Sequence, residues 1–311
     1  MLRASMTTLQ RSPPPASSIL DLIGHTPMVR LNRLSPNPRV AIYAKLEGFN
    51  PTGSIKDRIA LKMIEQAERE GRLAPGVTII EPTSGNTGIG IAMIGAVKGY
   101  RVEIVMSEAV SVERRKMIQA FGATVTLTDA RLGTDGAIVR ARELVQAFPD
   151  RYFMPDQFSN RYNQLAHYHG TAQEIPEQVG GHLDHFVSSL GTSGTLMGVG
   201  LALRERVPGV KIVSAHPVRN HYIQGLKNLD EAIVPAIYDA AQVDRHVMIE
   251  SEEAFAAARR IALEEAIFVG MSSGAALVAA RTVAAELSEG TIVTIFPDRG
   301  EKYLSTALFQ V

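Results

Sequence analysis

The sequence contains no cysteine. This absence excludes disulfides, thiolate metal sites, iron–sulfur clusters and a cysteine nucleophile, and nothing else in the composition asks for an oxidising compartment, so we expect a cytoplasmic protein. An excess of charge of one sign is also lacking, because 32 basic side chains balance 32 acidic ones. No overall field therefore draws the protein to nucleic acid or to an anionic membrane. No apolar run reaches the roughly 18 residues that span a bilayer.

What the 311 residues do contain is the composition of a globular protein, with 45% hydrophobic and 21% charged residues. Coiled-coil, disordered and disulfide-scaffold classes are excluded. The first twenty residues differ from the rest, since they hold Arg3, Arg11 and three consecutive prolines but no acid. They lack the apolar segment of a secretory signal. We expect residues 1–17 to form a flexible arm, and the sequence leaves open whether that arm is a targeting segment.

Short apolar runs and helical patterns alternate along the remaining chain. The runs predict strands over residues 40–46, 77–80, 101–106, 124–128, 185–190, 211–215 and 291–296. The helical patterns cover residues 54–70, 88–98, 112–121, 135–147, 196–206 and 252–264. Ser54 and Asp57 have capping-box spacing, which predicts that Ser54 caps the first of these helices. This alternation indicates an α/β protein of βαβ units with mostly parallel sheets and helices on both faces.

Two glycine-rich turns each follow a predicted strand and open a predicted helix. The first covers residues 81–88 (Glu-Pro-Thr-Ser-Gly-Asn-Thr-Gly), and the second covers residues 191–195 (Gly-Thr-Ser-Gly-Thr). Open α/β sheets bind ligands at the carboxyl ends of their strands, and a helix start offers free N–H groups to an anion. Either turn alone could be a plain tight connection. Together, two turns rich in hydroxyl groups predict either two anionic groups or one ligand and one substrate.

Nucleotide and metal sites do not fit the observed spacings. The dinucleotide pattern fails because Met93 occupies the third glycine position after Gly88 and Gly90, and no P-loop pattern occurs. His167 and His169 are close in sequence, as are His182 and His185, but no H-E-x-x-H pattern exists. We interpret these histidines as surface or structural residues and expect no metal.

Lys56 lies in the first turn of the helix predicted over residues 54–70. A cation there opposes the helix dipole, which is mildly unfavourable. It could be an ordinary solvated lysine, or a lysine whose proton is lost easily enough to form a Schiff base. The residues alone leave both readings open.

Taken together, the motifs resemble those of the cysteine synthase family, which belongs to the fold type II (tryptophan-synthase-β-like) pyridoxal-phosphate enzymes. The matching segments are residues 23–27, 51–58, 82–88, 191–195, 270–274 and the ending 300–306. The resemblance implies pyridoxal 5'-phosphate as cofactor and a homodimer. It also implies two domains, each a twisted, mostly parallel sheet flanked by helices. We expect a smaller mobile domain over residues 46–152, and a larger one formed by residues 18–45 and 153–311.

The resemblance also assigns roles to individual residues. Lys56 would hold the cofactor aldehyde and later remove the substrate Cα proton. Ser272 would face the pyridine nitrogen, where a neutral hydroxyl favours prompt loss of a β leaving group. The cofactor phosphate would be held by Gly191, Thr192, Ser193, Gly194 and Thr195. The substrate carboxylate would be bound by Thr83, Ser84, Asn86, Thr87 and Gln157, with Asn86 also bonding the cofactor ring hydroxyl.

The sequence departs from the family pattern in three places. His25 stands where the family has Asn, Ser193 where many members have Gly, and Leu226-Lys227-Asn228 where Ile-Gly is common. Lys227 is either a solvated surface lysine or a substrate-binding residue whose ammonium faces the β-substituent. The leaving group, acetyl or phosphate, and the sulfur donor, sulfide or thiosulfate, therefore stay open.

The resemblance implies β-replacement on an activated L-serine, O-acetyl-L-serine or O-phospho-L-serine, with sulfide or an equivalent to form L-cysteine. A cystathionine β-synthase-type condensation with homocysteine is the nearest alternative. A serine or threonine dehydratase shares the fold but fits the segment 83–88 less well. A non-catalytic scaffold of this fold is a further alternative, which the presence of Lys56 disfavours.

Overall fold

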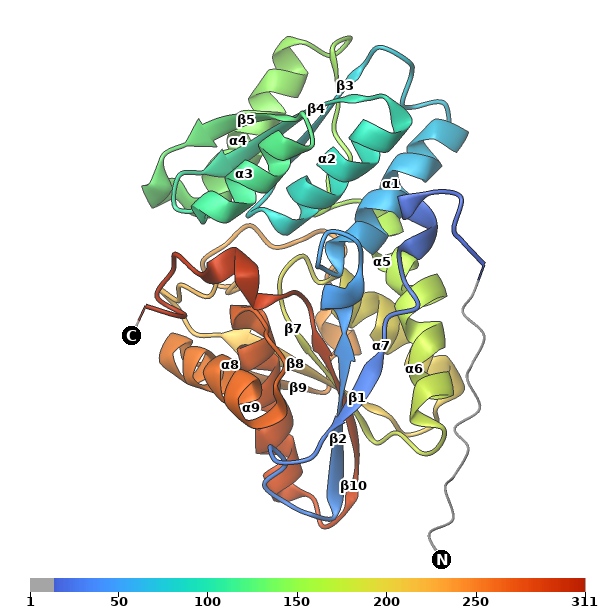
Figure 1. Ribbon diagram of the computed structural model, residues 1–311, viewed down its shortest axis with the longest axis vertical. Coiled ribbons are helices and arrows are strands. Elements are labelled where there is room, and N and C mark those ends of the chain that lie inside the picture. Colours follow the sequence, from blue (N-terminus) through green and yellow to red (C-terminus); the bar gives the residue numbers. More distant parts are fainter. Residues whose placement is uncertain (1–13, 311) are drawn as a thin grey trace, which may run out of the picture.

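The computed structural model describes residues 14–310 and contains two β-sheets with helices on both faces of each (Figure 1). The smaller sheet is entirely parallel, in the order β5-β4-β3-β6. Its strands are β3 (Thr78–Pro82), β4 (Arg101–Ser107), β5 (Thr124–Thr128) and β6 (Tyr152–Phe153). Helices α2 (Asn86–Lys98) and α3 (Val112–Ala120) cover one face, with α1 (Lys56–Arg69) packed beside α2, and α4 (Gly133–Ala147) covers the other face.

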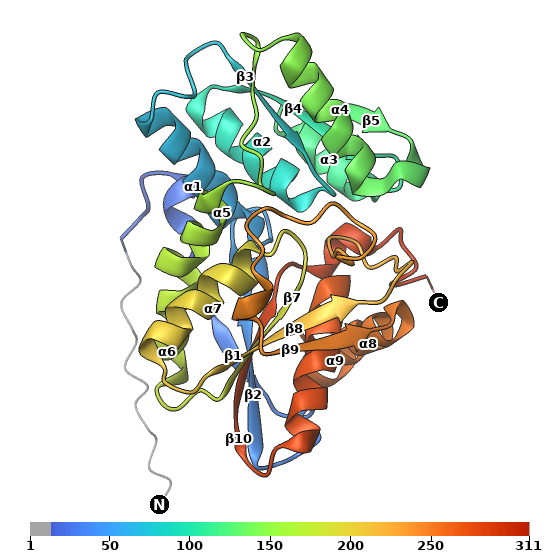
Figure 2. The same ribbon diagram turned by 180° about the vertical axis from the view of Figure 1, so that it is seen from behind.

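The larger sheet has the order β1-β2-β10-β7-β8-β9 and is parallel except for the antiparallel edge strand β1. Its strands are β1 (Met28–Leu31), β2 (Val40–Leu46), β7 (His185–Ser189), β8 (Lys211–Pro217), β9 (Arg245–Ile249) and β10 (Gly290–Phe296). Helices α8 (Ser251–Glu265) and α9 (Met271–Glu286) lie on one face. The other face carries α5 (Arg161–Ala166), α6 (Ala172–Val179) and α7 (Gly194–Arg206) (Figure 2). No helix among residues 14–310 is both long and apolar enough to cross a membrane.

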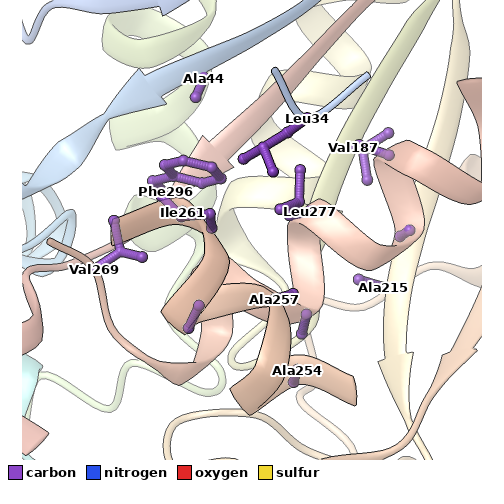
Figure 3. Close-up of a cluster of buried hydrophobic side chains, with 14 of the residues drawn as sticks. Leu34, Ala44, Val187, Ala215, Ala254, Ala257, Ile261, Val269, Leu277 and Phe296 are labelled. Carbon is purple, nitrogen blue, oxygen red and sulfur yellow. The ribbon is translucent and has the colours of Figure 1, made fainter. Parts of the chain in front are cut away.

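The main core of the larger sheet lies between its strands and the helix pair α8 and α9 (Figure 3). Small side chains let the two helices approach closely, since a Cβ at Gly274 of α9 would overlap the carbonyl oxygen of Ala254 on α8. Ile261, Leu277 and Phe296 fill the remaining space and are buried. This contact fixes the first turn of α9, which the site uses.

The α/β class and the parallel strands expected from the sequence are confirmed. Each predicted strand and helix is present within a few residues of the expected bounds. The elements that were not expected are β1, β6, β9, α5, α6 and α9. Two of these strands are too short to show a pattern, α6 contains Pro176, and most residues of α9 are buried, so no apolar stripe stands out.

The predicted cap of α1 is confirmed for the Ser54 hydroxyl, whereas the reciprocal bond from the Ser54 N–H to Asp57 is not formed. The residue before the helix is Ile55, and the Ser54 Oγ accepts a hydrogen bond from the backbone N–H of Lys56 at 3.1 Å. The Asp57 carboxylate instead accepts bonds from the N–H and hydroxyl of Thr52, the former at 2.7 Å. The bond to Asp57 therefore comes from Thr52, two residues earlier than the capping pattern indicated.

The predicted limits of the smaller domain, residues 46 and 152, each fall at an end of a strand. Residue 46 is the last residue of β2, and residue 152 is the first of the two residues of β6. The smaller sheet thus draws its strands from residues 78–153. Most of the predicted N-terminal arm, residues 1–13, lies outside the described residues.

Candidate active site

A single cavity between the two sheets brings together residues that are far apart in the sequence. It lies at the carboxyl ends of β3 and β7, where the two glycine-rich turns leave the sheets. Among the predicted site residues, all but Gly194 line this cavity: Lys56, Thr83, Ser84, Asn86, Thr87, Gln157, Gly191, Thr192, Ser193, Thr195, Lys227 and Ser272. Gly194 follows directly as the first residue of α7.

Lys56 is the first residue of α1 and lines the cavity. Burial lowers the pKa of its amine to about 8, and the nearby Asp298 carboxylate limits the shift. An ammonium with such a pKa loses its proton much more easily than an exposed lysine, whose pKa is near 10.4. The amine can therefore act as a nucleophile and as a base close to neutral pH.

The loop from β7 to α7 is shaped for an anion. Ser193 has a positive φ of 66°, and its Oγ is buried without a partner in the described part of the chain. A Cβ at Gly194 would overlap Asn163 Oδ1, so only glycine fits there. Asn163 Nδ2 also donates to Thr192 Oγ1 at 3.0 Å. Free N–H groups at the start of a 13-residue helix, together with the unpartnered Ser193 hydroxyl, fit a phosphate.

His167 supports this loop from behind. It is completely buried, and its Nδ1 lies 3.0 Å from Thr171 Oγ1 while its Nε2 lies 3.2 Å from Thr195 Oγ1. Burial lowers its pKa well below the usual value, so the ring is neutral. A structural histidine was expected at this position, but its contact with the phosphate-type loop could not be read from the sequence.

The loop from β3 to α2 is held open by a buried arginine. Gly85 has a φ of 131°, and a Cβ there would overlap the Arg114 side chain from α3. The Thr83 Oγ1 accepts from the Gly85 N–H at 3.0 Å, which tightens the turn. Thr83, Ser84, Asn86 and Thr87 line the cavity at the start of α2, which fits a second anion site.

Gln157 joins this second anion site from the segment after β6. Thr87 Oγ1 donates to Gln157 Oε1 at 2.7 Å, and Gln157 Nε2 donates to the Pro82 carbonyl at 3.0 Å. The backbone N–H groups of Asp156 and Gln157 donate to the two oxygens of Glu81, at 2.9 and 3.0 Å. Burial raises the pKa of Glu81 to about 8. Glu81 was not singled out from the sequence, although it begins the glycine-rich turn.

Ser272 lies in the first turn of α9 and lines the same cavity as Lys56. The close contact of α8 with α9 holds this turn in place. The side chain is 7% exposed and offers a neutral hydroxyl to whatever fills the cavity. The adjacent Ser273 is fully buried, and its Oγ has no partner in the described part of the chain.

Lys227 is not a solvated surface residue, and that reading of the sequence is wrong. Its side chain is 8% exposed, and its ammonium donates to Asp135 Oδ1 at 2.6 Å. The ammonium also lies 5.1 Å from the centre of the Phe158 ring. Because Asp135 belongs to α4 of the smaller sheet, this ion pair joins the two halves of the molecule at the cavity.

A buried polar network from the segment after β10 adjoins the cavity, which Tyr303 of this segment lines. Asp298 is 1% exposed and accepts from Asn86 Nδ2 and from the Tyr303 hydroxyl, both at 2.7 Å. Lys302 is 3% exposed and donates to Asn86 Oδ1 at 3.1 Å. The Arg114 guanidinium stacks on the Tyr303 ring. The sequence offered one signal for these residues, the C-terminal stretch 300–306, without a role for any of them.

Comparison with known proteins agrees with this geometry. Residues 19–298 match the family model of the pyridoxal-phosphate dependent enzymes. The chain is 48% identical over 300 residues to the cysteine synthase of Aquifex aeolicus, covering 94% of this chain and 92% of the relative. It superposes with a TM-score of 0.90 on a variant of O-ureido-L-serine synthase holding O-ureido-L-serine, at 43% identity, covering 95% of this chain and 94% of the other.

A second solved structure leads to the same family. Cysteine synthase of Entamoeba histolytica has a TM-score of 0.90 and 40% identity, covering 97% of this chain and 94% of the other. Both the family match and the identities extend over most of the chain. The chain therefore belongs to the pyridoxal-phosphate dependent enzyme family and, within it, to the cysteine synthases.

Proposed function

We propose that this enzyme replaces the β-substituent of an activated L-serine, O-acetyl-L-serine or O-phospho-L-serine, with sulfide or an equivalent to form L-cysteine. Formation of cysteine with pyridoxal phosphate is the activity of the family to which the chain belongs. One observation carries the assignment to this cavity. Lys56 lines the same cavity as two anion-type loops, one leaving each sheet.

The two loops differ in a way that suits two different anions. The loop 191–195 has the strained backbone and the unpartnered Ser193 hydroxyl that fit a phosphate. We assign Gly191, Thr192, Ser193, Gly194 and Thr195 to the cofactor phosphate. The loop 83–87 is braced by Gln157, and its hydroxyl groups suit a carboxylate. We assign Thr83, Ser84, Asn86, Thr87 and Gln157 to the substrate.

Bound pyridoxal phosphate withdraws electrons from the Cα of an attached amino acid, which lets a substituent leave from Cβ. The residues of this chain would orient the cofactor and the substrate and would carry the proton that moves. Lys56 would hold the cofactor and would afterwards carry the proton taken from Cα, a task for which a pKa of about 8 is suitable. Ser272 offers a hydroxyl to the pyridine nitrogen, without the charge of a carboxylate.

Lys227 bears on the choice of leaving group. Its ammonium lines the cavity and is paired with one carboxylate oxygen of Asp135. We propose that it attracts a charged β-substituent such as phosphate, or an anionic sulfur donor such as thiosulfate. An ammonium held at the cavity wall, and 8% exposed, supports this role better than a solvated one would.

The domain arrangement belongs to the same proposal. We propose that the smaller domain, residues 46–152, moves against the larger one, residues 18–45 and 153–311, and that closure excludes water during the reaction. The carboxylate loop and the phosphate-type loop belong to different sheets, which supports such a movement. A homodimer and a cytoplasmic location are expected from the resemblance and the composition.

A side-by-side assay tests the function. Cysteine formation is measured with O-acetylserine and with O-phosphoserine, each with sulfide, and cystathionine formation is measured with homocysteine as the competing nucleophile. We expect cysteine from at least one of the two substrates and a faster reaction with sulfide than with homocysteine. Lys56→Ala is the control and should lose both activity and borohydride-fixed cofactor. Normal turnover by Lys56→Ala would overturn the assignment of Lys56.

A further inference from the structure

We propose that Lys302 and Asp298 are positioning residues that lock the side-chain amide of Asn86 in one orientation. The inference rests on the proposed role of Asn86 toward the cofactor ring hydroxyl. It adds two residues from the C-terminal segment to the machinery of the site, through a contact that joins the two sheets.

The two side-chain contacts of Asn86 allow only one of the two orientations of its amide group. Asn86 Nδ2 donates to Asp298 Oδ2 at 2.7 Å, and Asn86 Oδ1 accepts from Lys302 Nζ at 3.1 Å. A flipped amide would place its NH2 group against the ammonium and its oxygen against the carboxylate. Both contacts would then become repulsive, because an ammonium only donates and a carboxylate only accepts.

The locked amide keeps one donor for the cavity. An asparagine Nδ2 carries two hydrogens, and Asp298 takes one of them. Asn86 lines the cavity, so its other N–H can point to an acceptor there. The ring hydroxyl oxygen of pyridoxal phosphate is such an acceptor when it is deprotonated. A flipped Asn86 would present a carbonyl oxygen to the same place.

The clamp itself is rigid. Asp298 Oδ2 also accepts from the buried Tyr303 hydroxyl at 2.7 Å. The Lys302 carbonyl accepts from Ser111 Oγ at 2.8 Å, which ties the segment to the start of α3 (Figure 1). Because both charged groups are nearly fully buried, water cannot replace either of them at the amide. Charge-assisted hydrogen bonds in such surroundings are stronger than neutral ones.

A second contact of Lys302 defines the rival explanation. Its Nζ also donates to the Gly53 carbonyl at 3.1 Å, in the turn that leads to Lys56. Lys302 could therefore support the turn of residues 51–55 alone, as a structural residue. The two explanations differ in one respect: only the clamp acts through the amide of Asn86.

A double-mutant cycle on the full-length apoenzyme separates the two explanations. Binding of pyridoxal phosphate is measured by equilibrium titration, together with the visible absorption spectrum of the reconstituted enzyme. Lys302→Met should weaken binding about tenfold, the effect of one hydrogen bond to a charged group, and should shift the visible band. Lys302→Arg keeps a charged donor and should restore both properties. In an Asn86→Ala background, Lys302→Met should change binding by less than about twofold.

Lys98 provides the matched control. It is the last residue of α2, the helix that Asn86 begins, and its ammonium pairs with Glu68 at 2.8 Å, away from the Asn86 amide. Lys98→Met should leave cofactor binding and the spectrum unchanged. If Lys302→Met does not fold, Asp298→Ala removes the other half of the clamp and enters the same cycle with Asn86→Ala.

Two results would overturn the clamp. One is wild-type binding and an unshifted spectrum in Lys302→Met. The other is an undiminished effect of Lys302→Met in the Asn86→Ala background, which would assign Lys302 to the Gly53 turn. A wild-type apoenzyme that does not bind pyridoxal phosphate would instead refute the proposed function, so the two failures are distinguishable.

Discussion

The ion pair of Lys227 with Asp135 makes a prediction about substrate choice that two variants can test in opposite directions. Lys227→Met removes the ammonium from the cavity wall and keeps a side chain of similar length. Asp135→Asn removes the opposing charge and keeps its shape, so the ammonium would face the cavity with less compensation. If Lys227 attracts a charged β-substituent, the first change disfavours O-phosphoserine relative to O-acetylserine. The second change favours it.

The magnitude follows from where the pair lies. An exposed ion pair contributes only ~0.2–1 kcal/mol, which is too little to set specificity. Lys227 is 8% exposed, and a hydrogen bond to a charged group in such a site contributes about 1.5–3 kcal/mol, or roughly 10- to 150-fold in kcat/KM. We therefore expect Lys227→Met to lower kcat/KM for O-phosphoserine at least tenfold while O-acetylserine changes little. Asp135 is 31% exposed and also accepts from the Ile233 N–H at 2.8 Å, so its loss should act more weakly.

The assay is steady-state cysteine formation with each substrate at saturating sulfide, for both variants and for the double variant. The ratio of the two kcat/KM values is the quantity of interest, because a loss of folded enzyme cancels from it. A link between the two sheets with no substrate contact would change both substrates equally in each variant. Parallel changes of this kind, or no change, would refute the proposed contact of Lys227 with the substrate.

Three further predictions concern the cavity. Because burial lowers the pKa of Lys56 to about 8 and only the neutral amine attacks, covalent attachment of the cofactor to apoenzyme should accelerate with pH, reach half its maximum near pH 8 and level off about one pH unit higher. Stopped-flow absorbance measures this, and a rate still rising above pH 10 would contradict it. If Ser84 and Thr87 bind the substrate carboxylate as proposed, the double change Ser84→Ala with Thr87→Ala should lower kcat/KM roughly 10- to 150-fold, and it also removes the bond from Thr87 to Gln157; unchanged kinetics would move the carboxylate site elsewhere. Gly194→Ala should weaken equilibrium binding of pyridoxal phosphate, because its Cβ would overlap Asn163; wild-type affinity would show that the loop has room to relax.

Much of the fold could be predicted because its signals are local. Strands such as β2 and β5 are short runs bounded by turns, and their predicted limits match the structure. The two glycine-rich turns follow strands of parallel sheets, so their position at the carboxyl ends follows from the topology alone. The stretches that gave no signal are those whose pattern is too short or uniformly apolar, as in β6 and α9.

Site residues that belong to a sequence motif could be predicted. Site residues that are brought to the cavity only by tertiary contacts were missed. Asn86 and Lys302 are 216 positions apart, and nothing near Lys302 in the sequence indicates an amide partner. Asp135 and Lys227 are likewise 92 positions apart. A charged residue looks the same in sequence whether water or a buried partner surrounds it. Burial distinguishes the two cases, and it depends on how whole elements pack.

A cluster of buried charges anchors the first turn of α1, which carries Lys56, and adds little field at the Lys56 amine. Arg58, two residues further along α1, donates to both Glu47 and Glu174 through bonds of 2.6–2.9 Å. Glu174 also pairs with Lys45, so two cations balance two carboxylates in this cluster. A balanced cluster adds little net field at Lys56, and burial is then the main cause of the lowered pKa of its amine. Breaking one partner of a buried pair costs about 3–5 kcal/mol. The first turn of α1 is therefore held firmly between β2 and α6, while its amine stays free for proton transfer.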